Sequence, residues 1–572
     1  MQPPIGVSDF RKLIETRDSD EQPYLFVDKS LFIKEIIDDL TEVKLFTRPR
    51  RFGKTLNMSM LHHFFSKEID NKETKNLFEN LKIIKYEQYV IKHQGQYPVI
   101  FLTFKDIKSQ SFKEAYNDLC KLLSTLYEQY EKIILSESIL TSRQKDQYRR
   151  VLDRQAPISD IKTALKDLTF CLHKSYGVKP IILIDEYDTP IQSAYIQKYY
   201  EKMIRFMRDF LSAGLKDNSH LEKAILTGIL RVSKESLFSG LNNLKTYSLL
   251  NARYGGYFGF TDPEVVELLE KTNLSKEIPI IKEWYNGYQI GDTVIYNPWS
   301  IVNYIQERGK LSSYWVNTSD NALIKDLISQ SNIGFKAQFE LLLQDKPIEM
   351  LINEYIVFTN LETNESAIWA LLLMSGYLKA TVIKEEGTNV LCRLQIPNKE
   401  VKDLYRTFIA EWLSGVNNAT VFNQFLNNLL IGNIADFEYQ LKEIMLKTFS
   451  VHDIKSREPE KFFHGFMLGL TACIDAEKYT IDSNKEAGFG RYDIIIAPKD
   501  PNKLGIILEI KSVGNNMSNL KIAAEEALMQ IDAKKYEKTI LFKGIKSYLK
   551  IGVAFSGKEL SIAHHLSSNG IT

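Results

Sequence analysis

Residues near the N-terminus have the types and the order that bind phosphate. Leu45–Thr55 reads LFTRPRRFGKT, and we call residues 48–55 the GKT loop. In the pattern G-x-x-x-x-G-K-[ST], the lysine reaches the β- and γ-phosphates of a nucleotide and the hydroxyl binds Mg²⁺. We therefore expect Lys54 and Thr55 to have these roles. The first glycine of the pattern would be residue 48, which is Arg48, so the tripeptide alone leaves a chance match open.

Two later segments supply the other groups that a nucleotide site needs. Pro180–Asp185 reads PIILID and is followed by Glu186. A carboxylate at Asp185 could complete the shell of Mg²⁺, and Glu186 could orient and deprotonate the attacking water. Ala224–Leu230 reads AILTGIL, and Thr227 in it could contact the γ-phosphate or that water. The two carboxylates alone could equally form a solvated strand end, but with the GKT loop they indicate a nucleotide site.

A second set of polar residues lies near the C-terminus. There RYDIII is followed, after a turn with Asp-Pro, by GIILEIKS. Glu509 and Lys511 are two apart in the second run, so in a strand both side chains project to one side. Asp493 beside Glu509 would give two hard oxygen ligands for Mg²⁺ or Mn²⁺, and Lys511 could orient a water for phosphodiester hydrolysis. From these residues alone, an exposed cross-strand salt bridge is the simpler interpretation.

The elements that would position the first set follow an α/β pattern. Short apolar runs at Val43–Thr47, Val99–Phe104, Pro180–Asp185 and Ala224–Leu230 are typical of buried parallel strands. Helical patterns separate these runs, so we expect an α/β sheet with right-handed crossovers. Ligands of such sheets bind where the strand ends converge, and that is where the carboxylates fall.

The middle of the chain has a different pattern of expected helices and strands. Asn297-Pro298 predicts a helix start. Ser366–Leu378 is an apolar helix, and KATVIKEEGTNVLCRLQI after it reads as a β-hairpin. Helix followed by hairpin is typical of a winged helix, which could touch DNA or, as we favour, cover the nucleotide and transmit its state.

Composition excludes several classes of protein. The 572 residues suggest about three or four domains of roughly 150 residues. Lys plus Arg is 73 and Asp plus Glu is 72, so any basic surface for nucleic acid must be local. The four cysteines show no metal-ligand spacing, which favours a reducing compartment. We see no signal peptide and no apolar run of spanning length, and therefore expect a soluble cytoplasmic protein with no membrane association.

Several motifs together resemble one family. YLFVDKS at Tyr24–Ser30, TRPRRFGKT, LIDEYDTPI, TGILRVSKESLFSGLNNL and WYNGY…YNPWSI are similar to the bacterial AAA-ATPase-like family, within the AAA+ and related signal-transduction P-loop ATPases. The resemblance covers roughly residues 5–320. It implies a P-loop fold that binds ATP and Mg²⁺, and it implies that a GKT loop without its first glycine is the usual form.

The same resemblance assigns further nucleotide-binding residues. It implies that Arg50, Arg51, Phe52 and Gly53 belong to the site together with the lysine and threonine. Arg48, Arg50 and Arg51 could supply charge to phosphates, or could face solvent or a partner subunit. Arg231 is a candidate sensor or finger arginine, with an exposed loop arginine as the alternative.

The C-terminal part resembles the PD-(D/E)XK nuclease superfamily. GRYD, EIK and ALMQIDAKKY carry this resemblance over roughly residues 455–555. It implies that Asp493, Glu509 and Lys511 form the catalytic core. Gln530 carries over as a supporting residue, and Glu486 could add a carboxylate.

One departure from the superfamily pattern stands beside that core. Tyr492 stands where the superfamily has proline. Members vary at this position, so the change argues little against the assignment. Tyr536 fits the family's helix, and we assign it no role.

Together these patterns predict an ATP-binding and ATP-hydrolysing protein that regulates a C-terminal metal-dependent nuclease, with defence against phage or mobile elements as a setting. We expect ATP and nucleic acid, chiefly DNA, as partners, and a homo-oligomer as a candidate assembly. One alternative is a signalling or assembly ATPase whose nuclease-like domain only binds nucleic acid or a protein. Another is a nuclease whose ATPase domain only binds nucleotide and uses it as a switch.

The predicted parts of the chain are a P-loop domain (1–255), a helical lid (256–365), a winged-helix-like segment (366–400), a helical linker (401–450) and a nuclease-like domain (451–572).

Overall fold

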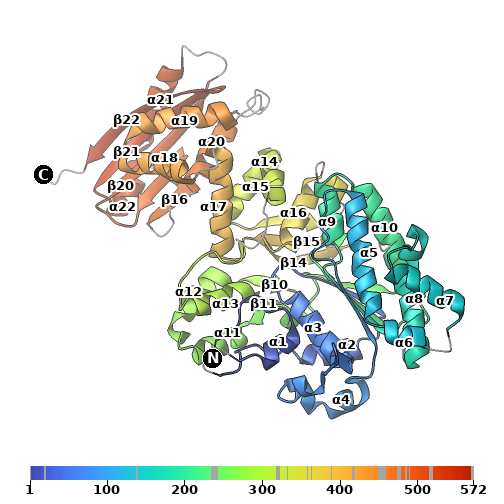
Figure 1. Cartoon of the computed structure of the whole chain (residues 1–572). Coiled ribbons are helices and arrows are strands. Elements are labelled where there is room, and N and C mark those ends of the chain that lie inside the picture. The colour runs from blue at the N-terminus through green and yellow to red at the C-terminus, as the bar shows by residue number, and fades with distance from the viewer. Residues whose placement is uncertain are drawn as a thin grey trace. The chain divides into compact units, whose positions relative to one another are not determined.

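The computed structural model divides the chain into two compact units (Figure 1). Unit 1 comprises Met1–Leu327 and Ile348–Val401, and unit 2 comprises Ile328–Pro347 and Lys402–Thr572. The residues described are 2–17, 21–136, 140–232, 242–316, 322–331, 333–356, 358–361, 364–387, 389–414, 419–448, 459–472, 474, 478–483, 486–487, 490–491, 493–513 and 519–568.

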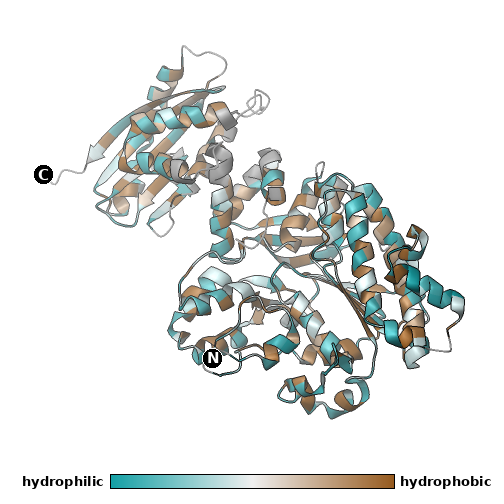
Figure 2. Ribbon diagram, in the orientation of Figure 1, coloured by the Kyte–Doolittle hydropathy of each residue, from teal (hydrophilic) through white to brown (hydrophobic). Residues whose placement is uncertain are grey.

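A parallel sheet of five strands is the core of unit 1. Every neighbouring pair in it runs parallel. Two of its strands, β1 and β5, are buried along their whole length, as expected for a sheet that is covered on both faces. Figure 2 colours each residue of the chain by its hydropathy, with apolar residues in brown. The α/β prediction is confirmed. The strand order is β4 (Val99–Thr103), β5 (Ile181–Asp185), β6 (Lys223–Gly228), β1 (Val43–Thr47) and β8 (Leu244–Tyr247).

Two strands of this sheet differ from what the sequence pattern indicates. β6 ends at Gly228, although the apolar run continues to Leu230. The backbone N–H groups of Ile229 and Leu230 donate to the Asp188 carboxylate, at 3.0 and 2.9 Å, instead of to a strand. β8 was not predicted, because its sequence LKTY has no apolar run; it pairs with β1 at the sheet edge.

The helices that follow these strands position the site. α3 (Lys54–Phe65) follows β1 directly after the GKT loop. α8 (Ile158–Tyr176) precedes β5 and packs on α10 (Tyr200–Leu215). A Cβ on Gly214 would lie 2.8 Å from the Cβ of Leu165, so glycine permits the close approach of these two helices.

Residues 256–316 add a small layer to unit 1. Strands β10 (Tyr288–Ile290), β11 (Thr293–Tyr296) and β9 (Phe260–Thr261) form an antiparallel sheet. Helix α13 (Pro298–Gln306) follows it, and the Asn297 side chain accepts from the backbone N–H groups of the first turn, at 2.9 and 3.3 Å. The helix start predicted at Asn297-Pro298 is therefore confirmed.

The predicted helix and hairpin are also present in unit 1. Helix α16 (Glu365–Met374) is followed by β14 (Lys379–Glu386) and β15 (Asn389–Gln395), which pair antiparallel. β12 (Ile348–Ile352) pairs with the other side of β15, giving a sheet of three strands. The winged-helix interpretation of this helix and sheet stays a prediction. The predicted division of this region into a lid and a winged segment stays a prediction.

Unit 2 has a mixed sheet of five strands. The first three strands run antiparallel to one another. The third and fourth are parallel and are joined through helix α21 (Leu520–Lys534), because parallel neighbours need a crossover. The order is β16 (Tyr479–Ser483), β19 (Ile494–Pro498), β20 (Leu504–Ser512), β21 (Ser547–Ser556) and β22 (Glu559–Ser568).

Helices of the predicted linker region pack on this sheet. α18 (Ala419–Ile431) contacts β20, and α19 (Ile434–Thr448) contacts β22. α20 (Pro459–Ala472) also contacts β20. In the part of the chain that the structure describes, no helix has both the length and the apolar character to cross a membrane.

A glycine sets the distance between α21 and the sheet of unit 2. A Cβ on Gly552, in β21, would lie 2.2 Å from the carbonyl oxygen of Ala524 and 2.5 Å from the backbone nitrogen of Leu528. Both atoms belong to the backbone of α21 and cannot turn aside as a flexible side chain would. The helix therefore lies on the sheet only because residue 552 lacks a side chain.

We expect Gly552→Ala to destabilise unit 2. Overpacking of a close contact costs about 1–3 kcal/mol, and here helix backbone must move. Urea unfolding followed by circular dichroism should show a lower midpoint than in the wild type. Gly505→Ala, in β20, is the control: there a Cβ would meet only side-chain atoms of Ile540 and Ile545, at 3.2 Å or more, which can give way, so this change should cost less. An unchanged midpoint in Gly552→Ala would show that α21 is not held by this contact.

Candidate functional sites

The GKT loop connects a buried strand to a buried helix. β1 ends at Thr47 and α3 begins at Lys54. Gly53 has a φ of 81° and Arg51 a φ of 67°. A left-handed backbone is ordinary for glycine but costs roughly 1–2 kcal/mol in other residues. The predicted strand, loop and helix are present, and the loop holds one strained residue.

Lys54 lies inside the loop rather than in solvent. Its side chain is 4% exposed. Its Nζ donates to the carbonyl oxygens of Arg48 and Pro49, at 3.1 and 3.0 Å. Both acceptors belong to the loop, so the amine is held close to the N-terminus of α3. Helix N-termini attract anions, and here the amine could exchange these carbonyls for phosphate oxygens.

A fully buried carboxylate joins three elements of the site. Asp185, at the end of β5, accepts from the Thr55 hydroxyl at 2.8 Å and from the Thr227 hydroxyl at 2.6 Å. Burial raises the pKa of Asp185, while the two hydroxyl hydrogen bonds and Lys54 act in the opposite direction. The sequence predicts this convergence of α3, β5 and β6. Both hydroxyl contacts could be exchanged for a hard cation such as Mg²⁺.

Glu186 follows β5 directly, and its carboxyl has a lowered pKa. Burial raises the pKa of its carboxyl, but Lys54, the Thr189 hydroxyl and Arg50 lower it more, and the pKa lies below its ordinary value. The Thr189 hydroxyl donates to Glu186 Oε2 at 3.0 Å. Glu186 has a φ of 55°, which turns the chain sharply after β5. A carboxylate that stays ionised could accept a proton from water.

The three residues that precede Gly53 in the GKT loop differ in how deeply their side chains are buried. Arg50 and Arg51 are exposed, and the Arg51 guanidinium lies 4.2 Å from the centre of the Trp299 ring. Phe52 is fully buried, with its ring 5.0 Å from that of Tyr288. Its side chain therefore packs in the core, and only its backbone could face a nucleotide.

Two further arginines are held by unit 1 itself. Arg48 is fully buried, and its Nη1 donates to the carbonyl oxygens of Thr47 and Tyr247 at 2.8 and 2.7 Å. Burial lowers the pKa of Arg48 to about 9. The alternative that Arg48 faces solvent is wrong, because the side chain ties β1 to β8. The Arg231 guanidinium lies 3.9 Å from the centre of the Tyr355 ring, so it is stacked, and its sensor role stays a prediction.

The second predicted set comes together on two antiparallel strands of unit 2. Asp493 directly precedes β19, where Ile494 pairs with Leu508 of β20. Glu509 directly follows Leu508, so the two carboxylates occupy the next position of the ladder. Asp493 Oδ2 accepts from the backbone N–H of Ile510 at 2.7 Å. Glu509 is 4% exposed, and a buried carboxylate requires compensating partners.

Helix α21 supplies neighbours to this pair. Gln530 Nε2 donates to Glu509 Oε1, so its side chain reaches this carboxylate, and its supporting role stays a prediction. Lys511 Nζ lies 3.3 Å from Glu526 Oε2. Glu509 and Lys511 are both on β20, separated by buried Ile510. The arrangement places two carboxylates, an amide and an amine within one local site, a donor set that fits Mg²⁺ or Mn²⁺.

Two family models match this chain. Residues 4–238 match the family described as "Predicted AAA-ATPase", named AAA-ATPase_like. Residues 458–565 match the PD-(D/E)XK nuclease superfamily. The chain has an AAA-ATPase-like domain and a PD-(D/E)XK domain. The first match contains the GKT loop, Asp185, Glu186, Thr227 and Arg231. The second contains Asp493, Glu509 and Lys511 of unit 2.

Two further comparisons each align with about 70% of this chain. The "Uncharacterized protein in vnfD 5'region" of Azotobacter chroococcum mcd 1 is 28% identical over 400 residues, which are 70% of this chain and 68% of that protein. The structure of the Aeropyrum pernix Orc1 protein in complex with DNA aligns with 9% identity and a TM-score of 0.23. That alignment covers 69% of this chain and 94% of that one.

Two more residues of the PD-(D/E)XK domain contact this site: His464, which the sequence does not single out, and Tyr536, which fits the family's helix and has no role assigned from the sequence. His464, on α20, has its Nε2 3.2 Å from the carbonyl oxygen of Asp493. Tyr536 is 1% exposed; burial and Glu509 raise the pKa of its phenol, and a Gln530 hydrogen bond lowers it. The two contacts join α20 and the end of α21 to the site. Periodicity gave no signal for either contact.

For Glu486, the predicted additional carboxylate, the structure describes the backbone but not the side chain. Glu486 lies in the short strand β17 and is paired in register with Arg491 of β18. Its side chain lies outside the described residues, as does Tyr492. No group of three or more His, Cys, Asp or Glu poised for a metal occurs among the residues described.

Asp188 of the AAA-ATPase-like domain was also missed, although it stands in the motif LIDEYDTPI. It is 1% exposed, and its Oδ2 accepts from the backbone N–H groups of Ile229 and Leu230. The Gln192 amide donates to the same oxygen at 2.7 Å. Asp188 therefore holds the backbone just after Thr227. Burial raises the pKa of Asp188 to about 6, against these hydrogen bonds.

This pKa predicts a pH-dependent stability. The folded-state pKa lies above the ordinary 3.8, so the contribution of Asp188 is full below about pH 4 and is lost as pH rises through about 6. The loss is about 3 kcal/mol, from about two pKa units. Asp188→Asn cannot ionise, so its stability relative to the wild type should improve by about 2 kcal/mol between pH 4.5 and pH 7.5 in urea unfolding, because part of the loss has already occurred at pH 4.5. Exposed Asp146→Asn is the control, and parallel pH profiles would contradict the expectation.

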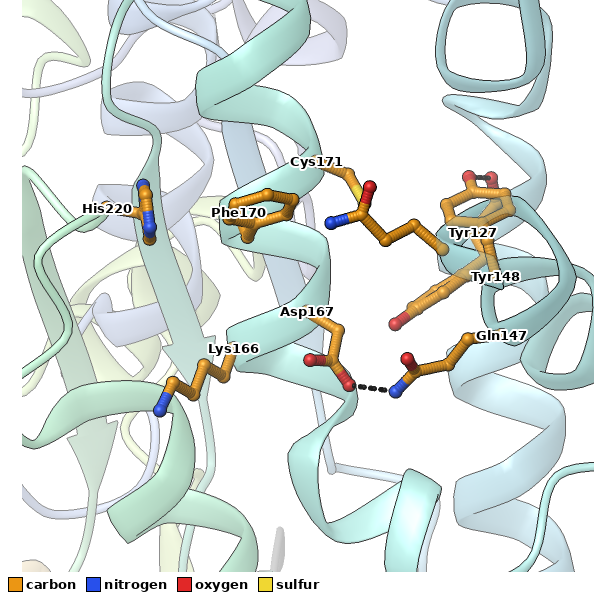
Figure 3. Close-up of a pocket in the computed structure, with 9 residues that line it drawn as sticks. Tyr127, Gln147, Tyr148, Lys166, Asp167, Phe170, Cys171 and His220 are labelled. Carbon is orange, nitrogen blue, oxygen red and sulfur yellow. Dashed lines mark hydrogen bonds between the residues drawn. The ribbon is translucent and has the colours of Figure 1, made fainter. Parts of the chain in front are cut away.

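A groove of about 270 Å³ lies elsewhere in the AAA-ATPase-like domain, among helices α5 (Phe112–Glu128), α7 (Ser142–Leu152) and α8 (Figure 3). Tyr127 and Tyr148 line it, and Gln147 Nε2 donates to Asp167 Oδ2 across it at 2.8 Å. None of the predicted nucleotide-site residues lines this groove. Ordinary packing between the helices accounts for its polar contacts.

Proposed function

We propose that this protein is an ATP-regulated nuclease. The observation that carries the proposal is the presence of two separate carboxylate sites in one chain. One contains Asp185 and Glu186 beside Lys54. The other contains Asp493 and Glu509 beside Lys511. The residues at each site are of the types expected from the family that matches that part of the chain. This agreement at both sites favours two activities over one.

In the proposed ATPase reaction, unit 1 binds the phosphates through the GKT loop. Lys54 exchanges its carbonyl acceptors for β- and γ-phosphate oxygens, and Thr55 and Asp185 hold the cation. Mg²⁺ at that position neutralises charge that develops on the phosphates. Glu186, kept ionised by Lys54, accepts the proton of the attacking water. Thr227 orients that water or the γ-phosphate.

In the proposed nuclease reaction, unit 2 cleaves a phosphodiester bond. Asp493 and Glu509 hold a divalent cation, and Gln530 orients Glu509 through its amide. A divalent cation held by these two carboxylates would polarise the phosphate and activate water. Lys511 orients the water and stabilises the negative charge of the transition state. DNA is the substrate that we expect.

Cleavage by the full chain tests the proposal. Purified protein is incubated with plasmid, linear duplex, single-stranded DNA and RNA, with Mg²⁺ or Mn²⁺, and with or without ATP. We expect cleavage of one of these substrates that requires the divalent cation and changes with ATP. Phosphate release is measured in the same reactions.

The outcomes separate the proposed function from its alternatives. ATP hydrolysis without cleavage of any substrate would overturn the nuclease and favour a signalling or assembly ATPase. Cleavage that depends on ATP without phosphate release would favour a nucleotide switch. If the protein shows no cleavage and releases no phosphate, both proposed activities are rejected.

A further inference from the structure

Two tryptophans contact successive arginines of the GKT loop. The indole N–H of Trp315 donates to the carbonyl oxygen of Arg50 at 3.0 Å. The Arg51 guanidinium stacks on the Trp299 ring at 4.2 Å. The C=O and the N–H of a trans peptide point in opposite directions. The Trp315 hydrogen bond therefore fixes the direction in which the loop presents the N–H of Arg51.

The preceding residue of the loop is held as well. A Cβ on Gly376 would lie 2.8 Å from the Cβ of Pro49, so the turn after α16 lies directly against the loop. The Trp315 ring is 5.3 Å from that of Tyr377 and 6.0 Å from that of Tyr288. Trp315 is thus packed among aromatic rings and cannot turn away without moving them.

One buried carboxylate anchors both tryptophans. Glu400 is fully buried. Its Oε1 accepts from the backbone N–H of Trp315 at 2.5 Å, and its Oε2 accepts from the hydroxyl of Ser300 at 2.8 Å. Ser300 follows Trp299 directly in α13. Burial raises the pKa of Glu400 to about 7, whereas these hydrogen bonds lower it. Loss of this carboxylate would release both tryptophan segments together.

Glu400 also lies in the first turn of helix α17, whose residues are divided between the two units. α17 runs over Lys399–Ser414. Its residues up to Val401 group with unit 1, and those from Lys402 group with unit 2. Because an α-helix is a continuous hydrogen-bonded rod, a displacement of its first turn is carried along its axis.

We propose that Glu400, acting through Trp299 and Trp315, is a positioning residue that couples the conformation of the GKT loop to helix α17. The inference rests on the proposed function, since it requires ATP at this loop. Phosphate at Lys54 would displace the carbonyls that Lys54 now contacts, and the peptide of Arg50 follows directly after them. Trp315 then moves with that peptide, and Glu400 moves with Trp315.

The test uses the full chain and four variants. Trp315→Phe keeps an aromatic ring but removes the N–H, and Glu400→Ala removes the anchor. The double variant shows whether the two act together, and Trp369→Phe, in buried α16, is the matched indole control. The dissociation constant of ATP with Mg²⁺ is measured by calorimetry, after circular dichroism confirms folding. Glu400→Gln replaces the alanine variant if the latter does not fold.

We expect each single variant to weaken ATP binding by about tenfold, the effect of one lost hydrogen bond. The double variant should bind ATP no more weakly than the weaker-binding of the two single variants, because the effects of substitutions within one network of contacts are not additive. Trp369→Phe should bind as the wild type does. Additive losses, or unchanged binding in Trp315→Phe, would overturn the inference.

Amide hydrogen exchange of residues 402–414 separates coupling from a purely structural role. If Glu400 and Trp315 only stabilised the fold, their substitution would not remove an ATP-dependent change in this exchange. In the wild type, saturating ATP with Mg²⁺ should change their exchange, and in both single variants this change should vanish even at saturation. Retention of the change in the variants, or its absence in the wild type, would overturn the coupling. Failure of the wild type to bind ATP at all would instead overturn the proposed function.

Discussion

Replacing Lys54 with alanine is expected to reduce ATP turnover by about 100- to 1,000-fold, the usual effect of removing one group that stabilises transition-state charge. Lys54 is the cation held inside the GKT loop, and its two present partners are loop carbonyls. Alanine leaves the phosphates without that charge. Phosphate release at several ATP concentrations measures the effect, and it separates weaker binding from slower chemistry.

Two further variants make this result specific. Lys85→Ala removes an exposed lysine of the same unit and should leave turnover unchanged. Glu186→Gln keeps the shape of the proposed base but cannot accept a proton, so it should still bind ATP while losing turnover. Turnover by Lys54→Ala equal to that of the wild type would show that hydrolysis, if any, occurs elsewhere in the chain.

Replacing Asp493 with asparagine is expected to abolish nucleic-acid cleavage, with a loss of at least about 100-fold, because a neutral amide cannot replace a carboxylate as a ligand of a hard cation. Asparagine keeps an oxygen that can accept from the backbone N–H of Ile510, as Asp493 does at 2.7 Å. The β19–β20 pairing should therefore survive. Rates of cleavage are compared over a range of Mg²⁺ and Mn²⁺ concentrations.

Asp500→Asn is the matched control for this change. Asp500 lies in the exposed turn between β19 and β20, where it accepts from the backbone N–H of Asn502 at 3.0 Å. The same chemical substitution there should leave cleavage intact. Cleavage by Asp493→Asn at the wild-type rate, with unchanged circular dichroism, would refute the proposed metal site.

Local sequence patterns determined the chemistry of both sites. The apolar run Val43–Thr47 is strand β1 residue for residue, because a central parallel strand is buried on both faces and its pattern is continuous. The GKT loop follows it at once. The alternation of Glu509 and Lys511 about a buried isoleucine likewise placed both on one side of β20. Such short-range patterns survive folding because neighbours in sequence stay neighbours in a strand.

Contacts between distant segments were decided only by the tertiary structure. β8 carries no apolar run, and it is a strand because β1 offers it a free edge of the sheet. Arg48, 199 residues from Tyr247, became a buried tie between these strands. Glu400 reaches Ser300 across 100 residues. No local period records which distant backbone a polar side chain will meet, since that depends on how the layers pack and on which donors burial leaves without water.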